Sequence, residues 1–200
     1  MSTANPSAHD GAAYPPLLEP PAVITALEQA HGAGFAQSCT PEVGRLLAAL
    51  ALSKPGGRIA ESGTGFGVGT AWLRSGLHGG AELLTVERDP GRADGAAELF
   101  RADPQLTVLT GDWTLLRRHA PYDLFFCDGG GKREDPDGVV DLLAPGGVLI
   151  LDDFSPSHQW PPLFNGAPDE LRIAYLTHPS LHAAEVQVAP AASVIIATRR

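Results

Sequence analysis

Four glycines, each separated from the next by one residue, follow a short apolar run in the first half of the chain. The segment from Arg58 to Leu73 is RIAESGTGFGVGTAWL, with glycine at positions 63, 65, 67 and 69. Glycine permits a turn with positive φ and lets a ligand approach the backbone closely. The residues that follow predict a helix, whose first turn offers free N–H groups and a positive dipole end. The pattern therefore predicts a strand, a tight turn and a helix that bind a nucleotide-type ligand.

Two familiar nucleotide motifs do not match this turn. The dinucleotide motif G-x-G-x-x-G requires glycine at its sixth position, which is Val68 when the count begins at Gly63. A phosphate-binding P-loop requires Lys followed by Ser or Thr, and the turn contains neither. A glycine-rich turn without a ligand is the alternative interpretation.

Carboxylates follow nearly every predicted strand. Short apolar runs predict five strands, over residues 59–62, 83–87, 106–109, 124–128 and 148–152. Ligands of open parallel sheets bind beyond the carboxyl ends of the strands, where acidic residues at these positions would gather. Such crowding is costly unless cations or hydroxyl donors fill the space. For any single residue, a solvated strand end or a helix cap is the alternative. The residues concerned are Glu61, Glu87, Asp112, Asp128, Asp152 and Asp153.

Two of these carboxylates suit particular parts of a nucleoside. Glu87 ends the second predicted strand about 24 residues after Gly63 and could accept hydrogen bonds from two ribose hydroxyls. Asp112 follows the third strand and could accept from an adenine amino group, with Trp113 packed on the ring. A divalent metal and a sulfonium cofactor with its ribose would together satisfy the acidic edge.

Strand and helix signals alternate along most of the chain, which predicts a parallel sheet covered by helices on both faces. Helical segments between the five strands are predicted over residues 70–77, 92–101, 113–118 and 138–143. Two helices precede the first strand, over 21–31 and from Pro41, with Thr40 as N-cap. A last helix over 169–177 is followed by strands over 184–188 and 194–198. The few residues between those strands cannot form a crossover, so they pair antiparallel or lie apart.

Composition limits the partners. The 200 residues carry a formal net charge of −9, which disfavours nucleic acid because that affinity depends on Lys and Arg. No apolar run approaches the roughly 20 residues of a membrane span, and we expect no membrane partner. With only Cys39 and Cys127, a reducing cytoplasm is the expected location. Residues 1–18 are rich in Ala, Ser, Pro and Gly and are expected to form a flexible tail.

Three segments carry a family resemblance. ESGTGFGVGTAWL, YDLFFCD and LLAPGGVLILDD resemble the corresponding motifs of class I S-adenosylmethionine-dependent methyltransferases, most closely the cation-dependent O-methyltransferases. That group includes catechol and caffeoyl-CoA O-methyltransferases and their bacterial relatives, and the resemblance extends from about Cys39 to the C-terminus. It implies an α/β, Rossmann-like fold with a seven-stranded, mostly parallel sheet whose last strand is antiparallel. It also implies a single methyltransferase domain over residues 19–200, after the tail.

The resemblance also implies a site. The metal ligands carried over are Asp128, Asp152 and Asp153, for a divalent ion such as Mg²⁺. Catalysis is assigned to Asp128 and Lys132. The expected contacts to S-adenosylmethionine come from Glu61, Gly63, Thr64, Gly65, Phe66, Gly67, Glu87, Arg88, Asp112, Trp113 and Asp128.

The chain departs from the family pattern at four points, the first of which is Val68-Gly69 in place of Tyr-Ser. Asp153 stands where Asn is usual and adds a negative charge. The family's catalytic Lys is the third residue after its metal aspartate, but here that position is Gly131 and Lys132 follows it. The interval from Asp128 to Asp152 is about two residues shorter than the family pattern implies. Two interpretations of Lys132 stay open: it enters the site on flexible glycines, or it is a surface charge.

The expected function is methyl transfer from S-adenosylmethionine to a small hydroxylated, aromatic acceptor, with a metal that lowers the acceptor's hydroxyl pKa. The alternative is a catalytically inactive S-adenosylmethionine-binding protein or partner subunit. A nicotinamide-dependent oxidoreductase is opposed by Val68. The sequence leaves open whether the protein forms a homodimer. The loop with His158 and Trp160 either walls a substrate pocket or is a plain surface loop.

Overall fold

The structure is a computed structural model that describes residues 17–200. The expected tail, residues 1–18, lies outside the described residues except for Leu17 and Leu18, whose side chains are exposed. Among residues 17–200, no helix is both long enough and apolar enough to cross a bilayer.

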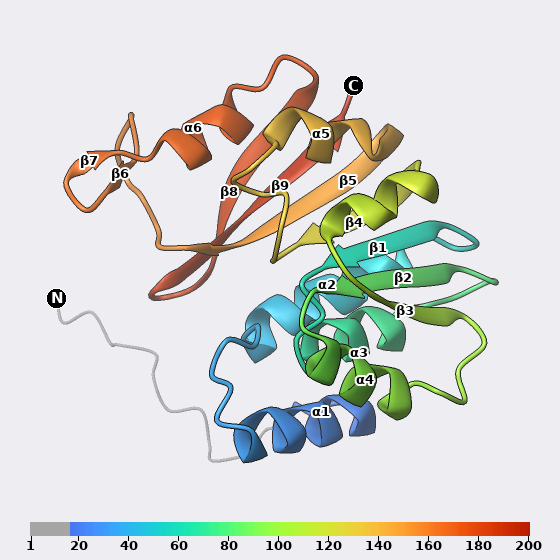
Figure 1. Ribbon diagram of the computed structural model, residues 1–200. Coiled ribbons are helices and arrows are strands. Elements are labelled where there is room, and N and C mark those ends of the chain that lie inside the picture. Colours follow the sequence, from blue (N-terminus) through green and yellow to red (C-terminus); the bar gives the residue numbers. More distant parts are fainter. Residues whose placement is uncertain (1–16) are drawn as a thin grey trace, which may run out of the picture.

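Seven strands form one sheet in the order β3-β2-β1-β4-β5-β9-β8 (Figure 1). The pairs from β3 through β5 are all parallel, whereas β9 is antiparallel to both of its neighbours, β5 and β8. The predicted fold class is confirmed. The antiparallel strand is the last one in the chain but lies inside the sheet, beside the edge strand β8. The strands are β1 (Arg58–Ser62), β2 (Glu82–Glu87), β3 (Leu106–Thr110), β4 (Tyr122–Cys127), β5 (Leu143–Phe154), β8 (Leu181–Ala189) and β9 (Ala192–Arg199).

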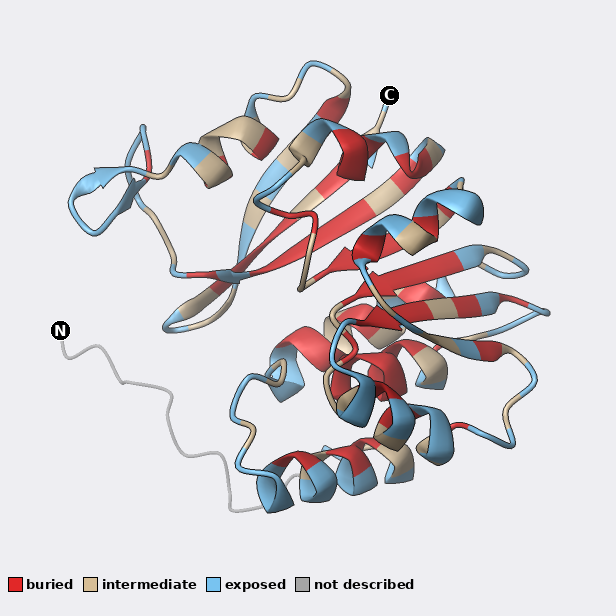
Figure 2. Cartoon of the chain, viewed as in Figure 1, coloured by how far each residue is buried: buried red, intermediate tan, exposed pale blue. Residues whose placement is uncertain are grey.

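Helices cover both faces of the sheet, with α1, α3 and α4 below it and α5 and α6 above it in the view of Figure 1. Alternate residues of a strand point to opposite faces, so a strand covered on both sides is apolar throughout. In β4, Leu124 and Phe126 pack under the first group of helices, and Phe125 and Cys127 under the second. The central strands are accordingly buried along most of their length (Figure 2). The helices are α1 (Pro21–Gly32), α2 (Pro41–Leu52), α3 (Val68–Ser75), α4 (Pro90–Leu99), α5 (Pro136–Asp141), α6 (Glu170–Leu176) and the 3₁₀-helix η1 (Trp113–Arg118).

Helix starts follow the expected capping chemistry. Thr40 accepts a hydrogen bond from the backbone N–H of Val43, and Pro41 is the first residue of α2. Asp89 and Asp135 cap α4 and α5 in the same way. Two local features differ from prediction: residues 113–118 form a 3₁₀-helix rather than an α-helix, and a small hairpin, β6 (Leu163–Phe164) with β7 (Ala167–Pro168), interrupts the segment before α6.

Candidate functional site

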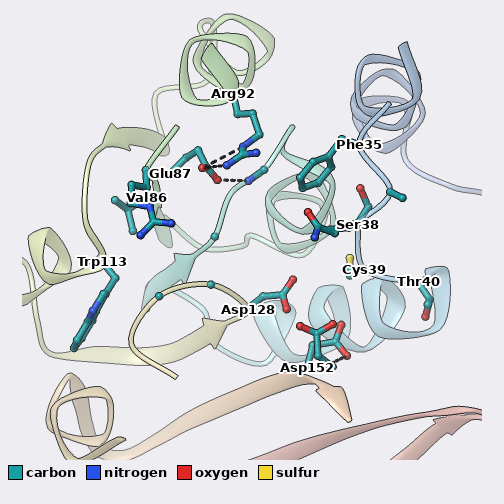
Figure 3. A pocket seen from close by; sticks show the side chains of 18 of the residues that line it. Phe35, Ser38, Cys39, Thr40, Val86, Glu87, Arg92, Trp113, Asp128 and Asp152 are labelled. Atoms are coloured by element: carbon teal, nitrogen blue, oxygen red, sulfur yellow. Dashed lines mark hydrogen bonds and ion pairs between the residues drawn. The ribbon is translucent and has the colours of Figure 1, made fainter. Parts of the chain in front are cut away.

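A cavity of about 870 Å³ opens at the carboxyl ends of the parallel strands. Its volume is within the range of small-molecule sites. The glycine turn, the residues after β2, β3 and β4, and the end of β5 line it, together with segment 35–40 and the turn between β8 and β9. In Figure 3, Phe35, Glu87 and Arg92 lie at one end, whereas Asp128 and Asp152 lie close together at the other. The topology therefore brings the predicted acidic edge and the predicted turn to one place.

The glycine turn needs glycine for two different reasons. Gly63 has φ +96°, and a Cβ there would lie 2.8 Å from the backbone nitrogen of Gly129, so the loops after β1 and β4 pack backbone against backbone. Gly67 has φ +90° and is the N-cap residue of α3. Left-handed conformations of this kind are accessible to glycine at little cost. The turn thus has the tight geometry that the sequence predicts.

Glu87 is tied to the glycine turn. Its Oε2 accepts a hydrogen bond from the backbone N–H of Gly65 at 2.8 Å. Its Oε1 accepts from the Asp89 backbone N–H at 2.9 Å and from the Arg92 guanidinium at 3.0 and 3.2 Å. Oε1 is thus fully engaged, whereas Oε2 has one acceptor direction left for a hydroxyl. The structure holds Glu87 at the cavity wall with a single free direction rather than as an open, paired acceptor.

Glu61 is buried beneath the turn. Its Oε2 accepts hydrogen bonds from the hydroxyls of Thr70 and Thr85, but its Oε1 has no hydrogen-bond partner among residues 17–200. Burial raises the pKa of Glu61 to about 7, against the lowering effect of the two hydroxyls. An unpaired buried carboxylate oxygen is expensive, so this position favours a cationic or hydrogen-bond-donating ligand.

Asp128 presents a second unpaired oxygen. Its Oδ1 is buried without a hydrogen bond to any described residue and lies 3.8 Å from the Lys132 ammonium. Burial raises the pKa of Asp128 well above its usual value, Lys132 opposes that rise, and Asp153, Asp152 and Glu61 add to it. Asp128 and Glu61 both line a small recess that also includes Gly63, Thr64 and Gly69.

Other predicted cofactor contacts have varied positions. Asp112 lines the cavity but also caps η1, because its Oδ1 accepts from the backbone and side chain of Thr114. Trp113 is mostly buried, and the Arg117 guanidinium lies 4.9 Å from its ring centre. Arg88 lines the main cavity. Thr64 and Phe66 border the small recess instead.

Lys132 lies inside the site and not on the surface. Only 6% of its side chain is exposed. Its Nζ donates to the backbone oxygen of Asp152 at 3.0 Å and to Oδ2 of Asp153 at 3.2 Å. The surface-charge interpretation of Lys132 is excluded by this burial.

The expected metal site is not formed. No group of three His, Cys, Asp or Glu side chains among residues 17–200 is placed to hold a metal ion. Asp153 has φ +72° and a side chain that is 71% exposed, while Asp152 turns its Oδ1 to the Asp153 backbone N–H at 2.8 Å. The Lys132 ammonium lies between the carboxylates. The donor set therefore does not fit the Mg²⁺ that the family resemblance implies.

Sequence reasoning missed several lining residues. Phe35, Ser38 and Cys39 come from the connection between α1 and α2, which carries no motif. Arg92 pairs with Glu87 and lies 5.3 Å from the Phe35 ring centre, so these three side chains form one wall. The only available signal was the spacing of Glu87 and Arg92 across the start of α4. The loop with Trp160 contributes Ser155 to the cavity, while Trp160 itself is 63% exposed.

Comparisons with known proteins agree with this geometry. Residues 60–154 match a family model described as "Methyltransferase domain". A "Putative O-methyltransferase" of Mycobacterium avium is 37% identical over 145 residues, which are 68% of this chain and 64% of that protein. A protein of the same description from Mycobacteroides abscessus is 34% identical over 68% of this chain and 66% of its own length. The chain thus spans slightly less than two thirds of these relatives.

Solved structures show the same fold. An O-methyltransferase of Bacillus cereus in complex with SAH superposes with a TM-score of 0.73 at 21% identity, over 92% of this chain and 93% of that one. The O-methyltransferase TomG of Streptomyces achromogenes, in complex with SAM, gives a TM-score of 0.73 at 20% identity, over 91% of each chain. Residues 60–154 thus match a methyltransferase domain, and the chain has the fold of these solved methyltransferases.

Proposed function

We propose that the protein transfers the methyl group of S-adenosylmethionine to the oxygen of a small hydroxylated, aromatic acceptor. The observation that carries this proposal is the presence beside the glycine turn of two buried carboxylate oxygens, Glu61 Oε1 and Asp128 Oδ1, that have no hydrogen-bond donor among residues 17–200. A buried acceptor without a donor is rare in folded proteins and requires an explanation, such as a ligand, an ion or a water molecule that supplies the donor. The relatives described as O-methyltransferases support oxygen as the acceptor atom.

Different residues of the chain would contact different parts of the cofactor. The glycine turn and Glu87 would hold the ribose end, and Arg88, Asp112 and Trp113 line the part of the cavity suited to the base. Glu61 would face the ammonium of the methionine end. When bound, S-adenosylmethionine supplies a methyl group on a positively charged sulfur, which an acidic pocket attracts.

The acceptor would bind near the ends of β4 and β5. Phe154 and Cys39 supply apolar surface to this part of the cavity, and Asp128 supplies a charge there, with the buried Lys132 ammonium 3.8 Å from its Oδ1. Asp128 Oδ1 accepts no hydrogen bond from residues 17–200, and burial raises the pKa of Asp128, so this carboxylate is suited to take the acceptor's hydroxyl proton. The acceptor oxygen would then bond to the methyl carbon as the carbon–sulfur bond breaks. The electron pair of the broken bond stays on sulfur. Alignment of the reacting atoms lowers the barrier of a displacement of this kind.

Calorimetry and a transfer assay test the proposal in two stages. S-adenosylmethionine or S-adenosylhomocysteine should bind with a micromolar Kd, on the order of −8 kcal/mol, and NAD should give no heat. Labelled methyl groups should then appear on phenols or catechols and not on matched anilines. Folded protein that binds neither cofactor form would remove the proposal.

The inactive-subunit alternative makes a different prediction. It expects cofactor binding without transfer to any hydroxylated acceptor. Lys132 is buried beside Asp128, and this position favours the enzyme. Burial of a charged group costs desolvation free energy, and a catalytic role would account for that cost. Transfer by the wild type separates the two alternatives, and Asp128→Asn should then reduce that transfer at least about 100-fold while the fold stays intact.

A further inference from the structure

The ammonium of Lys132 lies among the three aspartates that the family resemblance assigns to a metal ion. It is 3.2 Å from Asp153 Oδ2 and 3.8 Å from Asp128 Oδ1, the same oxygens that a bound ion would have to approach. Its third neighbour is the backbone oxygen of Asp152 at 3.0 Å. A divalent ion at this position would meet a buried positive charge within a few ångströms, and like charges in a site of low dielectric repel strongly.

The loop after β4 explains why Lys132 occupies this place. Gly131, where the family resemblance expects lysine, has φ +97°, and a Cβ there would lie 2.9–3.0 Å from the Trp113 ring and 3.0 Å from Val139. A lysine side chain has no room at position 131. The one-residue shift places lysine at position 132, behind a left-handed turn that sends its side chain back toward β5.

The backbone of Lys132 is fixed from two sides. The hydroxyl of Tyr175, a buried residue of α6, donates to the Lys132 carbonyl at 3.0 Å. The backbone N–H of Gly131 donates to Glu134 Oε2 at 2.9 Å. These contacts hold the loop, so the inward direction of the lysine is part of the fold and not one rotamer of a free side chain.

We propose that Lys132 is the built-in cation of this site and replaces a divalent metal, so that the protein works without one. The inference deepens the proposed function and rests on it for the methyl-transfer step. An ammonium has three N–H donors. Two of them contact Asp152 and Asp153, and the ammonium also lies 3.8 Å from Asp128 Oδ1, so its charge acts on the acceptor oxygen from behind the carboxylates that line the cavity. In this role the fixed charge supplies the electrostatic stabilisation that a metal would otherwise provide.

The first test is a metal titration of the unmodified protein. Mg²⁺ and Mn²⁺ should produce no saturable heat in calorimetry and shift the melting temperature by less than about 1 °C. Saturable binding to the wild-type protein that Asp152→Asn abolishes would overturn the proposal. This test needs no acceptor and no methyl transfer.

The second test removes the internal cation. In Lys132→Met the carboxylates lose their positive partner, and Mg²⁺ or Mn²⁺ should now raise the melting temperature by about 3–6 °C at tenfold excess over its Kd. Arg133→Met is the matched control, because Arg133 is exposed, adjacent and equal in charge. It should behave as the wild type does, with no metal response and unchanged activity.

Retained binding of S-adenosylhomocysteine shows that the Lys132→Met protein is folded. A folded variant without a metal response contradicts the proposal. If Lys132→Met does not fold, the titration is made with Lys132→Arg instead. This variant keeps a cation and should still exclude the metal. A metal response in folded Lys132→Arg would contradict the proposal as well.

The last test measures methyl transfer in the presence of a chelator. Transfer by the wild type should stay within about twofold in excess EDTA, because no step uses a bound ion. Loss of transfer in EDTA with recovery on adding Mg²⁺ would overturn the role of Lys132 while leaving the proposed function intact. Absence of cofactor binding would instead remove the proposed function and leave the metal titrations interpretable.

Discussion

Gly69, the second residue of α3, lies directly against the buried carboxylate of Glu61. A Cβ at position 69 would be 2.5 Å from Glu61 Oε1 and 3.1 Å from the Phe126 ring. Oε1 is also the oxygen that lacks a hydrogen-bond partner among the described residues. The last glycine of the turn is therefore required by packing on a functional carboxylate, and not by its own backbone conformation.

Gly69→Ala should consequently damage both stability and binding. The added methyl group must displace Glu61 or shift α3, which costs about 1–3 kcal/mol of unfolding free energy. Affinity for S-adenosylhomocysteine should fall with it. Gly95→Ala is the control: position 95 lies within α4 with nothing within 4 Å, so the same change there should stabilise by about 0.4–1 kcal/mol. Equal effects of the two substitutions in urea unfolding would disprove the packing argument.

Glu61 should make the ligand-free protein less stable as pH rises. Burial raises its folded-state pKa from 4.5 to about 7. Between these two values the unfolded chain loses this proton first, and the folded state is disfavoured by about 1.4 kcal/mol per pH unit, or about 3 kcal/mol in all. The effect is absent below pH 4.5 and complete above about pH 7.

Glu61→Gln isolates that effect. Urea unfolding at about pH 5 and about pH 8 should show a smaller loss of stability with rising pH than in the wild type. Glu98→Gln changes an exposed carboxylate and serves as the control, with the slope of the wild type. If the slope of Glu61→Gln equals that of the wild type, Glu61 is ionised in the folded protein at low pH.

Glu87→Ala should weaken the binding of S-adenosylhomocysteine by about 1.5–3 kcal/mol, or roughly tenfold to 100-fold. The substitution removes the acceptor for a ribose hydroxyl and also frees the Gly65 N–H and the Arg92 guanidinium. Glu82→Ala, at the exposed start of the same strand, should leave the Kd unchanged in parallel calorimetry. Unchanged affinity in Glu87→Ala would confine Glu87 to a structural role.

Asp112 requires a pair of substitutions because it caps η1 as well as lining the cavity. Asp112→Ala should lose about 1 kcal/mol of stability with the cap, and cofactor affinity should fall too. Asp112→Ser keeps a capping oxygen but lacks the second carboxylate oxygen, so it should retain stability and still bind more weakly. Wild-type affinity in the serine variant would show that Asp112 is a cap alone.

Local chemistry explains why much of the fold was predictable. Apolar runs separated by helical segments determine a parallel sheet, because each strand must be covered on both faces. Thr40 with Pro41 marked the start of α2 through a side chain that satisfies a free N–H. Acidic residues after the strands meet at one edge in any sheet of this topology, so Glu87, Asp128 and Asp152 could be placed together without coordinates.

The remaining features depend on contacts between distant segments. Phe35 and Cys39 enter the cavity because α1 and α2 pack on α3, and nothing in their own sequence indicates it. The hairpin of β6 and β7 lacks the alternation that marks longer strands, and Trp160 is exposed and does not line the cavity, in agreement with the surface-loop alternative.

The sequence by itself determined the sheet, the glycine turn and the identity of the charged residues, because these follow from local propensity and from the order of elements. Only the tertiary structure decided what the charges do. Lys132 is inside the site because Gly131 turns left-handed against Trp113 and because Tyr175 holds the Lys132 carbonyl from α6. The direction of a side chain after three glycines is set by such packing, which no local pattern encodes. The same packing fills the expected metal position with an ammonium group.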